Sequence, residues 1–466
     1  MLPAGDVENM RVVLDWTASL IPLASARTEL LLPGESGIFF TETVSTFGLY
    51  QGPEYDGCDP KREEGYPRWL EGPGGEGGWV RYDFGGNGFA EAGLMGIDYY
   101  WHTLDLENSA RYIPFATSYV DFYASHFPNR TQDGKLMIWP SQVLESWWCE
   151  WPASPSVNFD PTKCCQNDLP NVAALRSLVQ RLLGLPVESG LLTPAQRDHY
   201  TALSAILPEL PLDPKDGTYA AAQVLSSDAG HNSEGPWLFG THPFRLNTVG
   251  SATGSPSTVN LTASRATWVR QTWNTANSGW NYGTINAAML GFSAQAYAMV
   301  LDRARAAPPG GYRFPAFAQH YQDYEPSADH FSVMNTVSAA TILSVPSPTA
   351  NPLPPPPSPS PPHPPPPLSS QALHAMLLQN GEDDAKGTIV LLPAWPCELD
   401  VSFKLWGALN TSVEVLWANG ALVSLTVVPP ERASSVVFAP CNTTESRHTT
   451  TITNDMPKAG NHVGSV

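Results

Sequence analysis

Apolar residues recur at helical spacing in several stretches of the chain, with long non-periodic segments between them. Spacing of this kind places apolar side chains on one face of a helix. It predicts helices over 7–28, 88–104, 108–126, 170–185, 193–207, 282–305 and 370–380. The intervening loops, rich in Gly, Trp and Pro, cover 50–88, 139–168 and 226–258. Helices that alternate with long aromatic loops are typical of an α/α toroid, whose ligand site is built from loops at one end.

The hydrophobic period changes near the C-terminus, where short β-rich runs replace the helical pattern. They predict strands over 388–393, 401–406, 412–417, 421–428 and 434–439. Asn419-Gly420 between the third and fourth runs predicts a type I′ hairpin. We therefore expect a small antiparallel β domain over 386–445, followed by a disordered tail over 446–466.

A proline-rich segment over 346–368 divides the helical part of the chain into 1–345 and a last helix within 369–385. Such a segment adopts extended polyproline II rather than packed core. Its PPPPSPSPP run resembles the tracts of hydroxyproline-rich glycoproteins of plants and green algae, and a solvated linker is the alternative interpretation. Together with sequons at Asn129, Asn260, Asn410 and Asn442, it favours an extracellular or cell-wall location. No signal peptide is visible at the N-terminus.

Composition narrows the classes of partner. The net charge is 25 − 44 = −19, which argues against nucleic acid or an anionic membrane surface. No run of about 18 apolar residues predicts a membrane-spanning helix. Charged residues make up only 15% and there are 15 Trp, which suits an uncharged ring-shaped ligand such as a sugar. The chain shows no P-loop, dinucleotide fingerprint or G-x-S-x-G motif, so we expect no cofactor.

The six cysteines do not have the spacing of a zinc site, and we expect no metal. Adjacent Cys164 and Cys165 lack the usual C-x₂-C arrangement. Buried free thiols and one or more disulfides both remain open. Among possible disulfides, Cys397 with Cys441 is the preferred pair, because it would close a loop that spans the last β segment.

Four stretches resemble six-hairpin glycosidases: KLMIWPSQVLESWW, GPWLFGTHPFRLNTVG, SGWNYGTINAAMLG and LLPAWPCELDVSFKLWGALNTSVEVLWANGALVSLTV. The chain looks like an uncharacterised domain family that is similar to the family 95 glycoside hydrolases, which are α-L-fucosidases and α-L-galactosidases. The resemblance covers about residues 10–440. It implies a mainly α fold, an (α/α)6 barrel that lacks its first helices here, followed by a small β domain.

Glycoside hydrolysis needs two carboxyl groups that flank the scissile bond. The family pattern implies that Glu145, which follows Pro140-Ser141, is the general acid, and its Trp-rich surroundings would raise its pKa. Asp329 matches the position of the base, although an aspartate before a helix is also a common N-cap. Glu325 and Asp323 are the alternative candidates for the base. Asn87 matches one of two water-positioning asparagines, and Gly85 replaces the other.

Several further residues are candidates for contact with the sugar. Asp83 or Glu42 could support the base in place of the missing amide, although Glu42 and Glu91 fit helix-end or buried paired carboxylates equally well. Aromatic residues are candidates for stacking on sugar faces and histidines for bonds to hydroxyls, with core packing as the alternative. These candidates are Trp147, Trp148, Trp237, Trp280, His231, His242 and His330.

The sequence therefore predicts an exo-acting, inverting glycoside hydrolase that removes a terminal fucosyl- or galactosyl-type sugar from plant or algal polysaccharide. Its partner would be a carbohydrate. The alternative is a catalytically inactive carbohydrate-binding or cell-wall protein on a degenerate barrel, which Gly85 favours.

Overall fold

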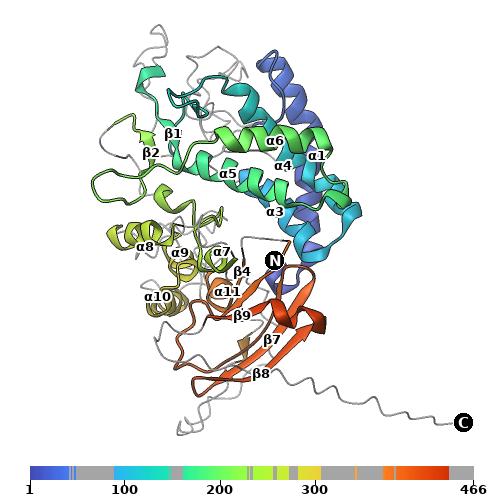
Figure 1. The fold of residues 1–466 in the computed structure, drawn as a ribbon, viewed down its shortest axis with the longest axis vertical. Helices are drawn as coiled ribbons and strands as arrows, with labels where there is room; N and C mark the ends of the chain where they lie inside the picture. The colour runs from blue at the N-terminus through green and yellow to red at the C-terminus, as the bar shows by residue number, and fades with distance from the viewer. Residues whose placement is uncertain are drawn as a thin grey trace, which may run out of the picture.

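Helices are the main secondary structure of the residues that the structure describes. The computed structural model describes residues 1–40, 44, 47–48, 89–144, 146–147, 161–227, 230, 235–254, 260–271, 282–305, 342–343, 371–381 and 385–439. Within these ranges short strands form three small sheets, and the helices do not close into a barrel. Figure 1 shows the N-terminal helices in the upper half of the molecule and the C-terminal strands below them. The expectation of a mainly α chain is confirmed.

The helices follow the predicted ranges closely in the first half of the chain and less closely in the second. One predicted helix, 282–305, is two helices, because Gly291 takes a left-handed φ of 80° between them. Two short helices, one of them over 261–270, lie where no helix is predicted. The described helices are α1 (Val7–Leu31), α3 (Phe89–Thr103), α4 (Leu106–His126), α5 (Leu169–Gly184), α6 (Pro194–Ile206), α7 (Val249–Gly254), α8 (Leu261–Arg270), α9 (Gly283–Met289), α10 (Ser293–Arg305) and α11 (Gln371–Leu377).

Polar side chains fix where several helices begin. The carboxylate of Asp105 accepts a bond from the Asn108 amide at 3.1 Å at the start of α4. Asp168 accepts one from the Asn171 amide at 2.9 Å at the start of α5, and Thr193 forms a capping box with Gln196 at the start of α6. Each cap satisfies backbone donors that the first turn leaves without partners.

The C-terminal strands confirm the predicted β segments but not a purely antiparallel arrangement. The strands are β1 (Gln166–Asp168), β2 (Ala222–Val224), β3 (Ile342–Leu343), β4 (Leu378–Asn380), β5 (Ile389–Leu391), β6 (Val401–Gly407), β7 (Thr411–Ala418), β8 (Ala421–Val428) and β9 (Val436–Phe438). Sheet β3-β6-β7-β8 is antiparallel, and its β7–β8 turn has Asn419 and Gly420 at φ 53° and 73°, as a type I′ hairpin requires. In sheet β4-β5-β9, however, β5 and β9 run parallel.

The segment expected to be a last barrel helix is helical only up to Leu377. Its continuation pairs with β5 as strand β4, because tertiary bonds outweigh the helical pattern there. The Gln379 amide donates to the carbonyls of Ala288 and Ala375 and accepts from the Gly250 amide, at 3.1, 3.0 and 2.8 Å. The strand is thereby fixed against α7 and α9.

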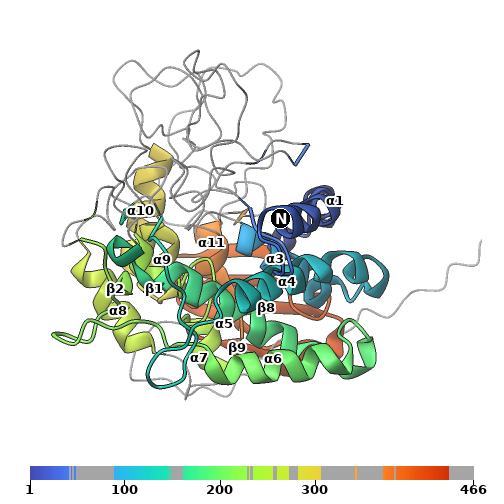
Figure 2. The same ribbon diagram turned by 90° about the horizontal axis from the view of Figure 1, so that it is seen from above.

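Two large hydrophobic clusters form the core. One packs α1, α3, α4, α5 and α6 together, and the other packs α9, α10 and α11 against β4–β8. Glycine allows close helix contact in the first cluster, since a Cβ on Gly93 of α3 would lie 3.1 Å from the Ala116 Cα of α4. Figure 2 shows α3, α5, α9 and α11 near one another in the middle of the molecule.

Candidate functional site

A cavity of about 260 Å³ lies where α3 and α5 face α9 and α11. It has room for several waters or for a ligand the size of one sugar ring. Each helix turns one stripe of side chains towards it, at the i, i+3, i+4, i+7 spacing of a single helix face. The stripe of α3 is Glu91, Leu94, Met95 and Asp98, and the stripe of α11 continues into β4 as Gln371, His374, Ala375 and Leu378. The wall is therefore mixed, with apolar patches and a few polar groups.

Three ion-paired side chains, Asp98, Arg181 and Arg245, lie at the cavity wall and form a triad. Arg245 donates from Nη2 to both carboxylate oxygens of Asp98, at 2.9 and 2.7 Å. Arg181 on α5 approaches the same carboxylate to 2.7 Å. Burial alone would raise the pKa of Asp98, but the two guanidinium groups outweigh burial and hold it at about 2. Asp98 is therefore ionised at any physiological pH.

Arg245 reaches Asp98 from a loop with an uncommon backbone conformation. Its φ is 53°, in the left-handed region that residues with a Cβ rarely adopt. Its amide donates to the Thr241 carbonyl at 3.1 Å, and the Asn247 amide donates to the Gly240 carbonyl at 3.0 Å. Such backbone strain costs about 1–3 kcal/mol and is concentrated at functional sites.

Glu91 is the titratable carboxyl of the cavity. Burial raises its pKa to about 7, although the positive charge of Arg245 opposes the shift. Among the described residues no hydrogen bond or ion pair holds its carboxyl group. A cavity-lining carboxyl with a pKa near neutrality is a frequent sign of a functional site. The sequence suggested that Glu91 is a helix-end or buried paired carboxylate. Its position in the first turn of α3 agrees with a helix-end carboxylate.

Two histidines of the cavity wall are neutral and incompletely bonded. Burial lowers the pKa of His242 to about 3, with a further contribution from Arg245, and that of His374 to about 4. In the part of the chain that the structure describes, His242 Nδ1 and His374 Nε2 are buried without a hydrogen-bond partner. A buried polar atom of this kind requires a water or a ligand as its partner.

Val143 and Trp147, on either side of the predicted general acid Glu145, are joined near the start of α5. The cavity lies beside the C-terminal half of the same helix. Val143 and Trp147 exchange two backbone hydrogen bonds, at 3.0 and 3.1 Å, and Leu144 between them has a left-handed φ of 46°. Trp147 is buried and packs edge to face against Trp237, with ring centroids 5.8 Å apart. Glu145 itself lies outside the described residues. The turn nevertheless puts its two neighbours, Leu144 and Ser146, in buried surroundings.

Asp168 supports this turn from the start of α5. Its backbone belongs to β1, and the neighbouring Cys165 pairs with Ser141 as an isolated bridge. Burial raises the pKa of Asp168 to about 6. The amide group of Gln142, next to Ser141, is buried with neither its nitrogen nor its oxygen bonded within the described segments. The Gln142 amide is therefore one of several buried polar groups in the described segments that have no protein partner.

The predicted site residues are described only in part. Trp147 and Trp237 contact each other and are not among the residues that line the cavity, whereas His242 lines it. Their contact with a sugar stays a prediction. The other predicted residues lie outside the described ranges: Glu145, Asp329, Asn87, Gly85, Glu42, Asp83, Asp323, Glu325, Trp148, Trp280, His231 and His330.

Disulfides account for two of the cysteines. Cys164 and Cys397 are each disulfide-bonded, and Cys165 is a buried free thiol whose pKa burial raises to about 11. Cys441 lies outside the described residues, so its pairing with Cys397 stays a prediction.

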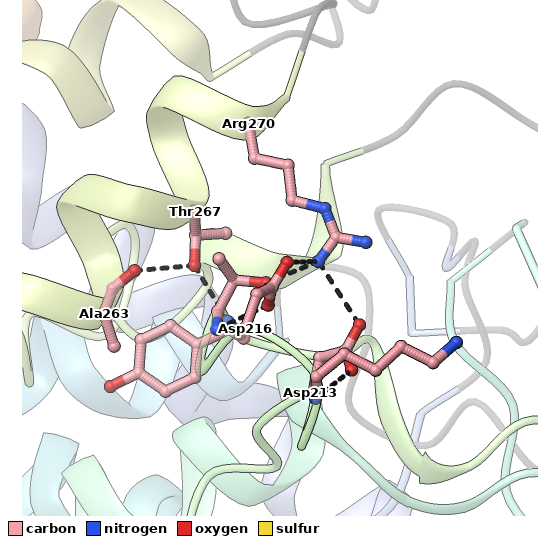
Figure 3. Close-up of polar contacts among 8 residues, drawn as sticks. Asp213, Asp216, Ala263, Thr267 and Arg270 are labelled. Atoms are coloured by element: carbon pink, nitrogen blue, oxygen red, sulfur yellow. Dashed lines mark hydrogen bonds and ion pairs between the residues drawn. The ribbon is translucent and has the colours of Figure 1, made fainter.

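A second polar cluster ties a surface loop to α8 (Figure 3). Arg270 Nη1 lies 3.3 Å from a carboxylate oxygen of Asp213 and 2.7 Å from one of Asp216. The Thr267 hydroxyl accepts from the Tyr219 amide at 2.8 Å and donates to the Ala263 carbonyl at 2.7 Å. The ion pairs are partly exposed, and these contacts explain the loop's conformation without a ligand.

Two comparisons with known proteins found no relative of this chain. No family model matches the sequence, and no curated protein matches it. Within the described ranges no group of three or more His, Cys, Asp or Glu residues could hold a metal ion. None of the described helices is both long enough and apolar enough to cross a lipid bilayer.

Proposed function

We propose that the protein is a glycoside hydrolase that removes single terminal sugars from plant or algal polysaccharide. The observation that carries the proposal is the cavity of about 260 Å³ with the Glu91 carboxyl on its wall. A pocket of one-ring size holds a single terminal sugar, whereas attack within a chain needs a longer groove. Mixed apolar and polar walls suit a sugar, whose ring has apolar faces and hydroxyl edges.

In this proposal the chemistry belongs to Glu145 and Asp329, which lie outside the described residues and are assigned by the family resemblance rather than by the cavity. Glu145 would protonate the leaving oxygen, and Asp329 would activate water on the opposite face in an inverting reaction. Leu144, which precedes Glu145 in the sequence, has a left-handed backbone of the kind that is concentrated at functional sites, and this supports the proposal. The helix stripes around the cavity support the proposed (α/α)6 architecture, because inner helices of such a barrel face one central site.

Disulfide bonds support the proposed extracellular or cell-wall location. Cys164 and Cys397 are both oxidised, and disulfides persist mainly outside the cytosol. The polysaccharide substrate would be met in the same compartment.

The second candidate is a carbohydrate-binding protein without catalysis. Gly85, where the related hydrolases have an asparagine, favours it, because the water-positioning amide is lost. Both candidates need a sugar pocket, so only turnover separates them.

The test is sugar release from a panel of plant and algal oligosaccharides. The parent protein should release monosaccharide, and Glu145→Gln should lower the rate by about 10²-fold or more, the usual contribution of a positioned acid. Glu188→Gln, an exposed change on the surface, is the matched control and should keep the parent rate. Binding without release by the folded protein would favour the second candidate instead.

A further inference from the structure

Two of the glycosylation sequons begin at exposed asparagines in loops of the described fold. A sequon is an asparagine followed by any residue except proline and then by serine or threonine. Asn129 begins one such triplet just after α4, and Asn410 begins another in the turn between β6 and β7. Both side chains are exposed, and neither carboxamide has a hydrogen-bond partner among the described residues. A bulky group on either carboxamide would therefore break no contact of the described fold.

The backbone around Asn129 is held in place although its side chain is not. The Asn129 carbonyl accepts a bond from the Met137 amide at 3.1 Å. Next to it, the Thr131 amide donates to the Lys135 carbonyl at 2.8 Å, and the Thr131 hydroxyl accepts from the Lys135 amide at 3.0 Å. The loop therefore keeps its conformation whatever the Asn129 carboxamide carries.

The turn that contains Asn410 is anchored on both sides of this residue. The Leu409 amide donates to the Trp101 carbonyl at 2.5 Å, and the Thr411 hydroxyl accepts from Arg432 Nε at 3.1 Å. Asn410 has a φ of 49°, in the left-handed region that asparagine adopts more readily than most residues. Its backbone is thus part of the turn, whereas its exposed carboxamide is not.

Asn260, which begins a third sequon, uses its carboxamide differently. Its side-chain oxygen accepts a bond from the Ala263 amide at 3.0 Å and caps the start of α8. Because this carboxamide already serves the helix, we assign no glycan to it. Asn442, in the fourth sequon, lies outside the described residues.

We propose that Asn129 and Asn410 each carry an N-linked oligosaccharide. The assignment rests on the proposed extracellular or cell-wall location, because sequons are modified in secreted proteins. The donor would be an oligosaccharide held on a lipid pyrophosphate. The bond between the anomeric carbon and the pyrophosphate oxygen breaks, and a bond from that carbon to Nδ2 of the asparagine forms. The lipid pyrophosphate leaves, and Nδ2 gives one proton to a base of the transferring enzyme.

Peptide mass spectrometry of the full chain, purified from the cells that make it, tests the assignment. Release of the glycans by peptide N-glycanase in water enriched in heavy oxygen converts each modified asparagine to an aspartate that carries the heavy isotope. We expect this label at both Asn129 and Asn410, and a sample kept without the enzyme controls for spontaneous deamidation. An unlabelled Asn129 or Asn410 overturns the assignment at that position.

Variants of the secreted full chain test each position separately. Asn129→Gln removes the first acceptor and leaves the Thr131 hydroxyl in its turn. Ser412→Ala destroys the second sequon but keeps asparagine at the left-handed position, and the Ser412 hydroxyl has no hydrogen bond within the described segments. Each variant should carry one oligosaccharide fewer than the parent by intact mass. Ser412→Thr preserves the sequon and should carry as many as the parent. A variant that keeps every oligosaccharide of the parent overturns the position it tests.

The outcomes separate this proposal from the proposed hydrolase activity. Glycans at both positions on a protein that releases no sugar would overturn the hydrolase and leave the assignment standing. Sugar release by an extracellular protein without these glycans would overturn the assignment alone. A cytosolic protein without them would overturn both the assignment and the proposed location.

Discussion

Arg245 and Asp98, 147 positions apart in the sequence, share two hydrogen bonds from a single nitrogen, at 2.9 and 2.7 Å. Because Arg181 reaches the same carboxylate from α5, this one aspartate joins α3, α5 and the loop over 240–248 at the wall of the cavity. The fold and the candidate site therefore depend on the same ionic contact.

Removal of the Asp98 charge should destabilise the protein strongly. Asp98→Asn would leave two partly buried guanidinium groups without their anion, and the loss of one partner of a buried pair costs about 3–5 kcal/mol. Asp216→Asn removes a similar contact to Arg270 at the surface and should cost no more than about 1 kcal/mol. Urea unfolding of both variants measures the difference, and equal effects would show that the triad is not a structural tie.

Glu91 should make the protein less stable as pH rises. Its pKa is raised from 4.5 to about 7 in the folded state, so the folded state holds the proton more tightly than the unfolded chain. The stabilisation is complete below about pH 4.5, decreases between that value and about pH 7, and amounts to at most about 3 kcal/mol.

Glu91→Gln should remove that part of the pH dependence. Unfolding free energies of parent and variant at pH 5 and pH 8 give the comparison, and the variant should gain relative to the parent at the higher pH. A constant difference between the two proteins would mean that Glu91 does not have a raised pKa.

His374 should act on stability in the acid range. Its pKa falls from 6.5 to about 4 on folding, so the unfolded chain takes up a proton that the folded protein refuses. Stability is therefore present above about pH 6.5 and is lost as pH falls towards 4. His374→Gln should lose less stability over this range than the parent, while His199→Gln, half exposed on α6, should follow the parent. Parallel curves for all three proteins would contradict a buried neutral His374.

Two glycines with left-handed backbones should respond differently to a methyl group. A Cβ on Gly37, at φ 87°, would lie 2.2 Å from the Ser118 carbonyl oxygen of α4, whereas nothing lies within 4 Å of one on Gly134, at φ 80°. Gly134→Ala should cost about 1–2 kcal/mol from backbone strain alone. Gly37→Ala should lower the free energy of unfolding clearly more, because the backbone of α4 cannot move freely away from the added methyl group. Equal shifts in melting temperature for the two variants would show that the contact with α4 is loose.

Local signals predicted much of the secondary structure. The Asn419-Gly420 turn and the strands around it follow from residues next to each other in the chain, and both are confirmed. The boundary at Leu377 could not be predicted in this way, since the helical pattern continues into β4 and only its pairing with β5 makes it a strand. The same limit explains the parallel β5–β9 pair, whose partners are far apart in the sequence.

The cavity could not be predicted from the sequence for a related reason. Glu91 and Asp98 each look like an ordinary polar residue on a helix, and only the packing of α3 against other elements turns both towards one space. The i, i+7 spacing of two carboxylates on an otherwise apolar helix face was the available signal. The triad needs Arg245, which no local pattern connects to α3.

The most direct test of the central claim follows the anomeric protons of released sugar by NMR while the protein acts on galactose-type oligosaccharides from plant or algal walls. We expect single terminal sugars to appear from the start, with the anomeric configuration inverted, and to be absent with Glu145→Gln. Release of internal fragments, or no release by a folded protein, would contradict an exo-acting glycoside hydrolase.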